Sequence, residues 1–396
     1  MTESARIGAV AMSTRSASAS SMFGMVAGEP SGDLLAGLLM DGLRARWPDV
    51  PTVGIGGPQM LARGFQSWWP MDKLAVRGYI EVLRHYAEIA SIRRQLKARL
   101  LAEWPQLFIG VDAPDFNLDL EAGLRGRGIR TVHFVCPSIW AWRPERIDKI
   151  RAAADHVLCI FPFEPALLAA HGVQASYVGH PLAQVIPMQP DALAARRALG
   201  LTDEGAVVAL LPGSRRSEMR YLATRFFEAA ALMRKAQPKL QFICPVVPSL
   251  LPEMEQLLQA SPMAGQVTLV RGQSHAALAA CDVTLIASGT ATLEAALFKR
   301  PMVIAYNMNR LSWRLMHRQQ LQPWVGLPNI LCEDFVVPEL LQDAATPQAL
   351  AEATLAWLQA PQEVHALQQR FSTLHDQLRR DTPALCAEAI AGVLDK

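Results

Sequence analysis

The chain has 396 residues, of which 51% are hydrophobic and 19% charged, and its formal net charge is +2. At roughly 100–200 residues per domain, this length predicts two or three domains. The near-neutral charge excludes the strongly basic surface on which non-specific nucleic-acid binding depends, so we expect no nucleic-acid partner.

The beginning of the chain differs in composition from the rest. Residues 1–21 are rich in serine and lack the continuous apolar segment of a secretory signal, so we interpret them as a flexible leader. Beyond them, short β-rich apolar runs alternate with helical patterns, which predicts βαβ units with parallel sheets. The predicted strands are 22–27, 51–56, 106–111, 130–135 and 155–160, then 206–211, 240–247, 266–270, 282–287 and 301–305.

A stretch with three prolines, residues 179–191, interrupts this alternation and is the best linker candidate. We therefore predict an α/β protein of two doubly wound domains, residues 22–185 and 186–360, followed by a helical tail. Ligands in such folds bind beyond the carboxyl ends of the strands. The residues that follow each predicted strand are thus the candidates for function.

The first such stretch is AGEPSGD, residues 27–33. Its glycines permit a tight turn, Ser31 or Asp33 can cap the following helix, and Glu29 is left at the mouth of the sheet. A functional role for Glu29 and a plain strand–turn–helix junction remain equally open. The stretch is not GxGxxG, so it does not predict a dinucleotide site.

Two further stretches offer hydrogen-bond donors at a helix start. In LLPGSRRSEMRYL, residues 210–222, Gly213 and Ser214 precede Arg215 and Arg216, and cations at a helix N-terminus favour an anionic partner. The alternative is an exposed basic first turn. Because the GK[ST] ending of a Walker loop is absent, we predict another kind of phosphate site.

The other donor stretch is ASGTATLEAAL, residues 287–297. Ser288, Gly289 and Thr290 present donors, and Glu294 lies one turn into the helix, where it could reach a ribose. The alternative is a Ser/Thr-capped helix with an acidic first turn. Two phosphate-type loops in one half of the chain indicate a diphosphate ligand.

The fourth stretch, GVDAPDFN at residues 110–117, carries two acids directly after a predicted strand. Asp115 could cap a helix that starts near Asn117, which would leave Asp112 as a candidate general base. The alternative is that both acids form local hydrogen bonds only.

Two tryptophan-containing stretches are less specific. PSIWAWRPERI, residues 137–147, combines Trp140 with Arg143 and indicates either a sugar- or lipid-phosphate platform or a loop packed on the core. The other stretch is residues 67–83, SWWPMDKLAVRGYIEVL, which contains Trp68 and Trp69. Its mixture of basic and aromatic side chains is typical of a membrane interface, and the alternative is a core helix packed under a loop.

Together these stretches resemble the lipid-A-disaccharide synthase family. The resemblance runs in order through AGEPSGD (27–33), GIGGPQM (54–60), the region 75–83, DAPDFN (112–117), PSIWAWRPERI (137–147), FPFE (161–164), VGHP (178–181), LLPGSRRSE (210–218), LIASGTATLE (285–294) and LPNIL (327–331). Pro30 departs from the alanine expected there, which concerns the turn more than the chemistry.

The resemblance implies a GT-B fold, with two Rossmann-like domains facing a cleft and a C-terminal segment, 361–396, that returns to the first domain. It implies an inverting transfer from UDP-2,3-diacylglucosamine to 2,3-diacylglucosamine 1-phosphate (lipid X), which yields a β-1,6 disaccharide and UDP. Under this resemblance Asp112 is the base with Glu29 nearby, and the acceptor or lipid side comprises Ser31, Trp140, Arg143, Trp68 and Trp69.

The same resemblance assigns the nucleotide and diphosphate to Ser214, Arg215, Ser288, Gly289, Thr290, Glu294 and Asn329. With arginine and helix dipoles available, we expect no metal and no cofactor. The expected location is the cytoplasmic face of the inner membrane, as a peripheral protein. Since some family members exchange C-terminal segments, a homodimer is also an expectation.

Three alternatives stay open at this point. The chain resembles other GT-B enzymes in its SGTATLE and PGSR segments, so a UDP-sugar 2-epimerase or a peptidoglycan-type transferase is one alternative class. A non-catalytic lipid carrier would bind acylated glucosamine but would have no use for a UDP site.

Overall fold

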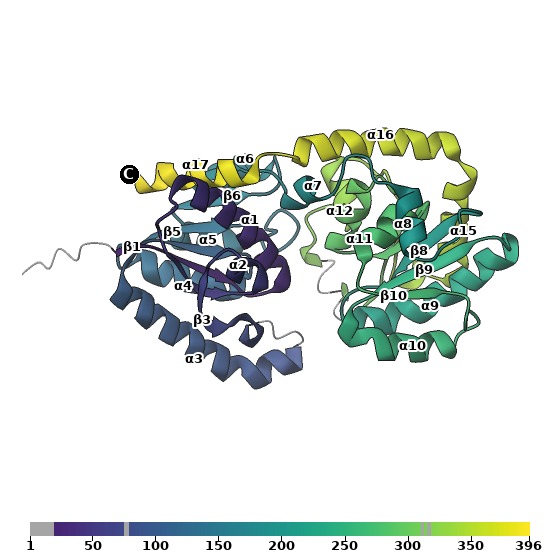
Figure 1. The fold of residues 1–396 in the computed structure, drawn as a ribbon, viewed down its shortest axis with the longest axis horizontal. Helices are drawn as coiled ribbons and strands as arrows, with labels where there is room; N and C mark the ends of the chain where they lie inside the picture. Colours follow the sequence, from purple (N-terminus) through teal and green to yellow (C-terminus); the bar gives the residue numbers. More distant parts are fainter. Residues whose placement is uncertain (1–19, 75–78, 310–312, 315–317) are drawn as a thin grey trace, which may run out of the picture. The chain divides into compact units, whose positions relative to one another are not determined.

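The computed structural model of the chain describes all residues except 1–19, 75–78, 310–312 and 315–317 (Figure 1). Most of the expected leader therefore lies outside the described residues. The first strand begins at Ser20, two residues earlier than the sequence pattern predicted.

Contacts divide the described chain into two compact units. Unit 1 comprises the described residues up to Val135 together with Asp148–Val157 and Cys386–Lys396. Unit 2 comprises Cys136–Ile147 and Leu158–Leu385. The end of the chain, Cys386–Lys396, thus clusters with the first unit, whereas the rest of the C-terminal segment 361–396 and the loop 136–147 cluster with the second.

The first sheet has seven strands in the order β3-β2-β1-β4-β5-β6-β7. Its strands are β1 Ser20–Ala27, β2 Thr52–Gly56, β3 Gln66–Pro70, β4 Pro105–Val111, β5 Arg130–Phe134, β6 His156–Cys159 and β7 Ala175–Tyr177. The connecting helices are α1 Pro30–Arg46, α2 Pro58–Leu61, α3 Tyr79–Glu103, α4 Pro114–Arg125, α5 Arg146–Ala153 and α6 Glu164–Ala169, with a short 3₁₀ turn, η1, at Met71–Lys73.

The second sheet has six strands in the order β10-β9-β8-β11-β12-β13. Its strands are β8 Val207–Leu211, β9 Gln241–Val246, β10 Thr268–Arg271, β11 Val283–Ala287, β12 Met302–Tyr306 and β13 Glu339–Leu341. The helices are α7 Pro181–Val185, α8 Ala192–Ala198, α9 Arg216–Ala236, α10 Leu251–Gln259, α11 Ser274–Ala280, α12 Thr290–Leu297, α14 Leu327–Leu331, α15 Pro347–Gln359, α16 Pro361–Leu378 and α17 Thr382–Leu394, with 3₁₀ turns η2 Pro248–Leu250 and η3 Gln342–Ala344.

Burial explains why these strands read as continuous apolar runs. Every residue of β2, β8 and β11 is buried, and Figure 1 shows helices on both faces of each sheet. Parallel strands covered on both faces must be apolar throughout rather than alternating. The predicted α/β class with two doubly wound sheets is confirmed. The pattern missed only short edge strands, because β3, β7 and β13 are half-buried and carry little apolar signal.

The strand order places one reversal point in each sheet. The chain starts at β1 and moves outward to β2, then crosses back to β4 on the other side of β1. The same happens at β8, which pairs with β9 on one side and β11 on the other. Since the loops diverge at such a point, they leave a crevice beyond the carboxyl ends of these strands. The loops after β1 and β4, and those after β8 and β11, therefore define the candidate sites.

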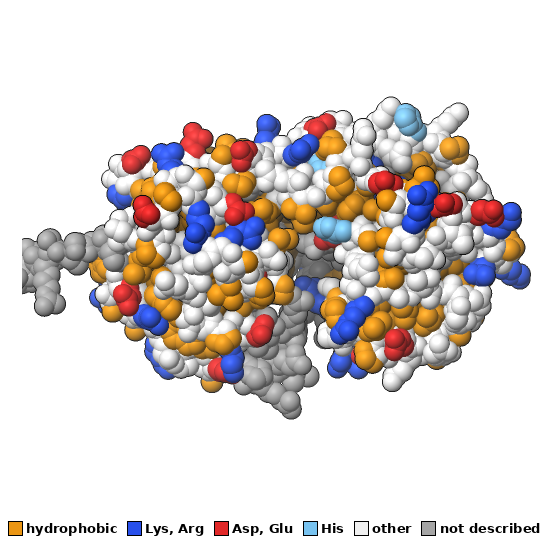
Figure 2. All heavy atoms as spheres, viewed as in Figure 1, with side chains coloured by type: hydrophobic (Ala, Val, Ile, Leu, Met, Phe, Trp, Pro, Cys, Tyr) orange, Lys and Arg blue, Asp and Glu red, His pale blue; other side chains and the backbone are white. Residues whose placement is uncertain are grey.

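The surface does not add a strong signal of its own. Figure 2 shows hydrophobic side chains interspersed with side chains of both charge signs on the face drawn there. Among the described helices, none combines the length and the hydropathy that a membrane span requires.

Candidate functional site

Asp112 occupies a strained turn at the end of β4. Its φ is 52° and that of Ala113 is 44°, so two consecutive non-glycine residues adopt left-handed backbone. Such residues cost of order 1 kcal/mol each and are retained where the surroundings fix them. Here Asp112 N–H donates to the Phe134 carbonyl (2.9 Å), and the Asn117 amide donates to the Asp112 carbonyl (2.8 Å). The turn thus directs a carboxylate away from the buried strand.

Small residues after β1 make room for this turn. A Cβ added to Gly28 would lie 3.4 Å from the Ala113 Cβ, and one added to Gly32 would lie 3.9 Å from the Asp112 Cβ. The two loops of the crevice therefore pack closely. Glu29 and Asp112 line one cavity of about 350 Å³, whose other residues are Gly28, Leu74, Ile89, Ala90, Arg93, Ala113, Pro114, Asp115 and Phe116.

A buried Glu121–His133 pair lies behind the turn. His133 Nδ1 is 2.8 Å from Glu121 Oε1, and both side chains are fully buried. Burial lowers the pKa of His133. The effect of Glu121, with a smaller contribution from Asp112, is in the opposite direction and outweighs burial, so the net pKa is raised. Gly110 allows this approach, since a Cβ there would lie 1.9 Å from Glu121 Oε1. Asp112 therefore adjoins a fixed, polar interior rather than an apolar one.

The acids expected to cap helices in this unit have other roles. Helix α4 begins at Pro114, so Asp115 lies in its first turn and is not its N-cap. Helix α1 begins at Pro30 with Glu29 at the N-cap position, which leaves Ser31 exposed within the helix. Asp33 accepts from Gly57, Gln59 and Met60 N–H groups (2.9, 2.8 and 3.1 Å) and so caps α2 instead. This contact joins the AGEPSGD and GIGGPQM stretches.

In unit 2 the loops after β8 and β11 line a cavity of about 730 Å³, here called the diphosphate pocket. Its lining includes Gly213, Ser214 and Arg215 from the first loop, and Ser288, Gly289, Thr290 and Glu294 from the second, so the structure brings these expected residues together. The residues that follow β9 and β10 also line it: Pro245, Val246, Val247, Pro248, Gly272 and Ser274.

A carboxylate already occupies the donors of the first loop. Glu218 Oε2 accepts from Ser214 N–H (3.1 Å) and Arg215 N–H (3.3 Å), and Glu218 Oε1 pairs with Arg215 Nη1 (2.9 Å). Gly213 has φ 117°, and a Cβ there would lie 2.5 Å from the Glu218 Cβ. Sequence reasoning missed Glu218, although an acid three residues after the N-cap is the capping-box signal. These contacts show that the loop accepts an anionic group.

The adjacent arginine points elsewhere. Arg216 pairs with Glu253 (2.9 Å), which also accepts from Arg220 (3.0 Å), and Arg216 does not line the diphosphate pocket. The expectation that Arg216 adds a phosphate donor is therefore not met. The two side chains leave the chain differently because Arg215 is the N-cap of α9 with extended backbone, whereas Arg216 is the first helical residue.

The second loop is tied to the wall beside it. The Ser288 hydroxyl donates to the Val325 carbonyl (3.1 Å) and its N–H to the Ala305 carbonyl (2.9 Å), so its hydroxyl hydrogen is used within the fold. Thr290 is exposed at the first position of α12, where main-chain N–H groups lack helical acceptors. Glu294 lines the pocket one turn later and its Oε2 lies 3.2 Å from His275 Nε2.

Asn329 is a support rather than part of the pocket lining. Its side chain is fully buried, its amide donates to Val337 O (2.9 Å) and Glu339 Oε1 (2.8 Å), and its Oδ1 accepts from Val336 and Val337 N–H (both 2.9 Å). These four hydrogen bonds use the full capacity of the amide. In this structure it fixes α14 and does not face a ligand.

The loop 137–147 lies beside the diphosphate pocket within unit 2. Trp140 is buried, donates from Nε1 to Glu164 Oε1 (3.0 Å) and packs edge-on against Phe161 and Phe163. Arg143 lies over the exposed Trp142 ring (4.5 Å). Trp140 was expected on the acceptor side, but here it shares a cavity with Arg215 and Ser288. The contacts responsible are long-range, since Gln322 donates to the Trp140 carbonyl (3.1 Å).

Glu164, from the FPFE stretch, has an unusual environment that sequence reasoning did not predict. It is 1% exposed, and burial raises its pKa to about 7 despite hydrogen bonds from Phe161 N–H and Trp140. A carboxyl group with such a pKa is close to half protonated near neutral pH. Glu164 therefore holds the Trp140 loop as a carboxyl group that is only partly ionised near neutral pH.

The expected lipid-side tryptophans of unit 1 are half-buried on β3. Trp68 and Trp69 pack against the core that includes Leu96, Leu100 and Phe108, and the Arg99 guanidinium lies 3.9 Å above the Trp68 ring. The stretch 67–83 is therefore a strand and a 3₁₀ turn up to Lys73, and part of it lies outside the described residues.

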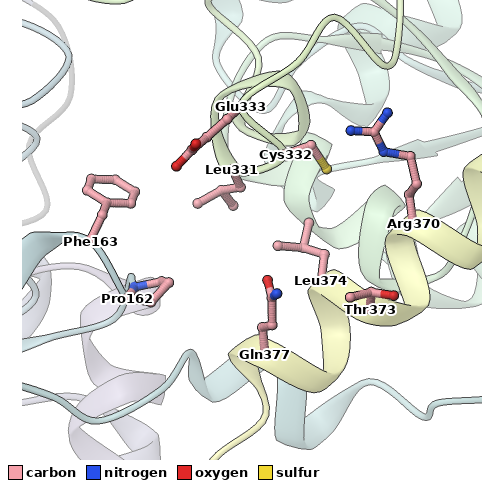
Figure 3. Close-up of a pocket in the computed structure, with 9 residues that line it drawn as sticks. All are labelled: Pro162, Phe163, Leu331, Cys332, Glu333, Arg370, Thr373, Leu374 and Gln377. Atoms are coloured by element: carbon pink, nitrogen blue, oxygen red, sulfur yellow. The ribbon is translucent and has the colours of Figure 1, made fainter.

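A further cavity of about 560 Å³ lies between residues 162–163, the segment after α14 and helix α16 (Figure 3). Its lining combines Phe163, Leu331 and Leu374 with Arg370, which pairs with Asp334 (2.8 Å). It shares no residue with the loops after β8 and β11. Among the described residues, no group of three or more His, Cys, Asp or Glu side chains is arranged to hold a metal ion.

Comparisons with solved structures concern the fold. The chain is similar to a UDP-GlcNAc 2-epimerase from Neisseria meningitidis solved with UDP-GlcNAc, at TM-score 0.60 and 11% identity, covering 94% of this chain and 98% of that one. It is also similar to a glycosyltransferase from Rickettsia africae, at TM-score 0.56 and 8% identity, covering 94% and 97%. The predicted GT-B class of fold is confirmed, and at these identities nothing more follows.

Comparisons of sequence are far closer. A lipid-A-disaccharide synthase from Albidiferax ferrireducens is 67% identical over 375 residues, which cover 93% of this chain and 96% of that protein. One from Verminephrobacter eiseniae is 62% identical over 378 residues, with the same coverage of 93% and 96%. The family model for lipid-A-disaccharide synthetase matches residues 23–390. The chain belongs to the lipid-A-disaccharide synthase family.

Proposed function

We propose that the chain is an inverting glycosyltransferase that makes the lipid A disaccharide. It transfers the sugar of UDP-2,3-diacylglucosamine to the 6-hydroxyl of lipid X, giving a β-1,6-linked tetraacyl disaccharide 1-phosphate and UDP. The observation that carries this proposal is the family match, which extends over residues 23–390 and so includes both candidate sites. A non-catalytic lipid carrier would bind no UDP and so would not need the diphosphate pocket.

Asp112 is the proposed general base. Its carboxylate takes the proton of the acceptor 6-hydroxyl as the oxygen forms a bond to the anomeric carbon of the donor. The bond from that carbon to the diphosphate breaks, and its electron pair leaves with UDP. One displacement converts an α-linked donor into a β product, so the reaction needs one base and stabilisation of the leaving group. Glu29 lines the same cavity as Asp112 and is proposed to assist it in catalysis.

The leaving diphosphate is the proposed ligand of the loops after β8 and β11. Arg215 provides charge-assisted hydrogen bonds, and the N-terminus of α12 provides main-chain N–H groups at Gly289 and Thr290. Ser214 lines the same pocket, with its N–H bonded to Glu218. Glu294 is proposed to hold the ribose. Because these groups meet the developing negative charge, the proposal includes no metal ion or cofactor.

The proposed location is the cytoplasmic leaflet of the inner membrane, because both substrates carry acyl chains. Trp68 and Trp69, half-buried on β3 and close to Lys73, are the described residues proposed to contact the lipid surface. A homodimer formed through the C-terminal segment is a further proposal that follows from the family.

The test is UDP release by the purified chain in detergent. We expect release that requires both UDP-2,3-diacylglucosamine and lipid X, with the disaccharide detected in equal amount by mass spectrometry. Turnover of water-soluble UDP-GlcNAc alone would indicate epimerase chemistry instead. Binding of the acylated substrates without any release would support a carrier and contradict the proposal.

A further inference from the structure

A second cavity of about 430 Å³ adjoins the diphosphate pocket and is here called the aromatic pocket. Five aromatic side chains line it, together with three aliphatic ones: Trp140, Trp142, Tyr306, Trp313, Trp324, Val325, Leu327 and Ile330. Such a concentration of rings in one half of an enzyme that has only nine tryptophans needs a ligand that is itself apolar.

The aromatic pocket is continuous with the diphosphate pocket. Trp142, Arg215, Glu218 and Ser288 line both cavities, so they form the boundary between them. A molecule whose diphosphate lies on Arg215 and the N-terminus of α12 therefore extends its attached group into the aromatic pocket. The UDP-linked donor is the substrate with that connectivity.

One wall of the aromatic pocket is held by hydrogen bonds within the chain. Glu339 accepts from Val325 N–H and Gly326 N–H (both 2.9 Å) and from Asn329 (2.8 Å). The Ser288 hydroxyl holds the Val325 carbonyl from the opposite side. The loop of the diphosphate pocket and the apolar wall are thus one hydrogen-bonded structure, which fixes the distance between a bound diphosphate and an apolar group.

Most polar side chains of this pocket lie at its boundary or are bonded within the chain. Arg215, Glu218 and Ser288 also line the diphosphate pocket, where Arg215 pairs with Glu218 and Ser288 donates to Val325 O. Gln320 and Gln322 line the aromatic pocket, but their amide groups donate to backbone, to Gln322 O (2.7 Å) and Trp140 O (3.1 Å). Sugar binding requires several donors and acceptors directed at hydroxyl groups, whereas a hydrocarbon chain requires only apolar surface. The lining therefore favours a chain.

We propose that the aromatic pocket binds one acyl chain of the UDP-linked donor and selects its length. The proposal rests on the proposed function, which supplies an acylated nucleotide sugar as the ligand. Each methylene group removed from water contributes roughly a fourfold factor in affinity, so a pocket of this kind discriminates chains that differ by several methylenes.

The experiment compares two donors that differ only in acyl length, one long and one several methylenes shorter. Leu327→Trp fills the pocket, and we expect kcat/KM for the long donor to fall at least ~10-fold while that for the short donor stays within about threefold. The inhibition constant of UDP should not change. Leu193→Ala, at an exposed position on α8, is the control and should leave both donors unaffected.

A binding readout separates this proposal from the reaction itself. A donor with a brominated long chain should quench tryptophan fluorescence on binding, and Trp313→Phe should reduce the quenching without altering UDP affinity. Equal losses with both donors, or no quenching, would overturn the pocket assignment even if UDP is released normally. Quenching without any disaccharide formation would contradict the proposed function and leave the acyl site standing.

Discussion

The turn at Asp112 and the diphosphate pocket occupy the same position in two similar sheets, yet their chemistry is opposite. Both follow strands at a reversal of strand order, β1 and β4 in one unit and β8 and β11 in the other. The first presents the acids Glu29 and Asp112 on a strained backbone, whereas the second presents Arg215, glycines and helix N-termini. The fold thus determines where ligands bind, and a few loop residues determine which charge is bound.

The two regions also differ in the surroundings of a buried carboxyl group. Behind Asp112, Glu121 is paired with His133, and this contact raises the pKa of His133. Beside the diphosphate pocket, Glu164 accepts hydrogen bonds from Trp140 and Phe161, and burial raises its pKa to about 7. The carboxyl group behind Asp112 is thus paired with a histidine whose pKa is raised, whereas the one beside the diphosphate pocket is itself shifted toward its neutral form.

The largest effect should come from removing the acid of the first region. Asp112→Asn should lower the rate of UDP release roughly 10²–10⁴-fold, because the amide cannot accept the acceptor proton. Asp148→Asn, an exposed acid on α5, is the matched control and should keep its activity. A loss smaller than tenfold in steady-state kinetics would show that another group is the base.

The second region is tested by two adjacent arginines. Arg215→Ala should lower kcat/KM for the donor about 100-fold, since it removes a charge-assisted donor to the leaving diphosphate. Arg216→Ala should change it little, because that side chain pairs with Glu253 outside the pocket. If both variants lose the same activity, the contrast between the two side chains is refuted.

The buried carboxyl group of Glu164 should make the stability of the protein depend on pH. The folded-state pKa of Glu164 lies above its usual value of 4.5, so its ionisation opposes folding. The free energy of unfolding should therefore be highest below pH 4.5, decrease as the pH rises to about 7, and change no further from this group above that. When the pH is raised from 5 to 8, the Tm of Glu164→Gln should fall by about 5 °C less than the Tm of the wild type. Identical slopes in calorimetry would contradict this assignment.

A change in the Glu121–His133 pair should give the smallest effect. Glu121→Gln replaces the carboxyl group that contacts His133 by an amide of similar size, and we expect a stability loss of about 1 kcal/mol, or roughly 2–4 °C in Tm. Because the pKa of His133 is raised, the stability it contributes is complete below pH 6.5 and decreases as the pH rises through its folded-state pKa. The wild type should thus lose its advantage over the variant with rising pH, and an NMR titration of His133 should show a lower pKa in the variant.

The sequence determined the class of fold, the loops that form the two sites and the family. Buried parallel strands are apolar along their whole length, so β4, β8 and β11 were visible as runs, and the loops after them could be located within one or two residues. The grouping of Ser214, Arg215, Ser288, Gly289, Thr290 and Glu294 around one cavity follows from strand order once those loops are known. These properties depend on local pattern and on the connections of βαβ units.

Only the tertiary structure decided where individual side chains point. Asp33 caps a helix through residues 24 to 27 positions away, and Trp140 is held through Gln322, 182 positions away. Asn329 is enclosed by its own hydrogen bonds, and Arg216 turns toward Glu253 although its neighbour Arg215 lines the pocket. A residue's partners across such separations are set by packing, which local spacing does not encode, and this is why the loops could be predicted from the sequence but their side-chain roles could not.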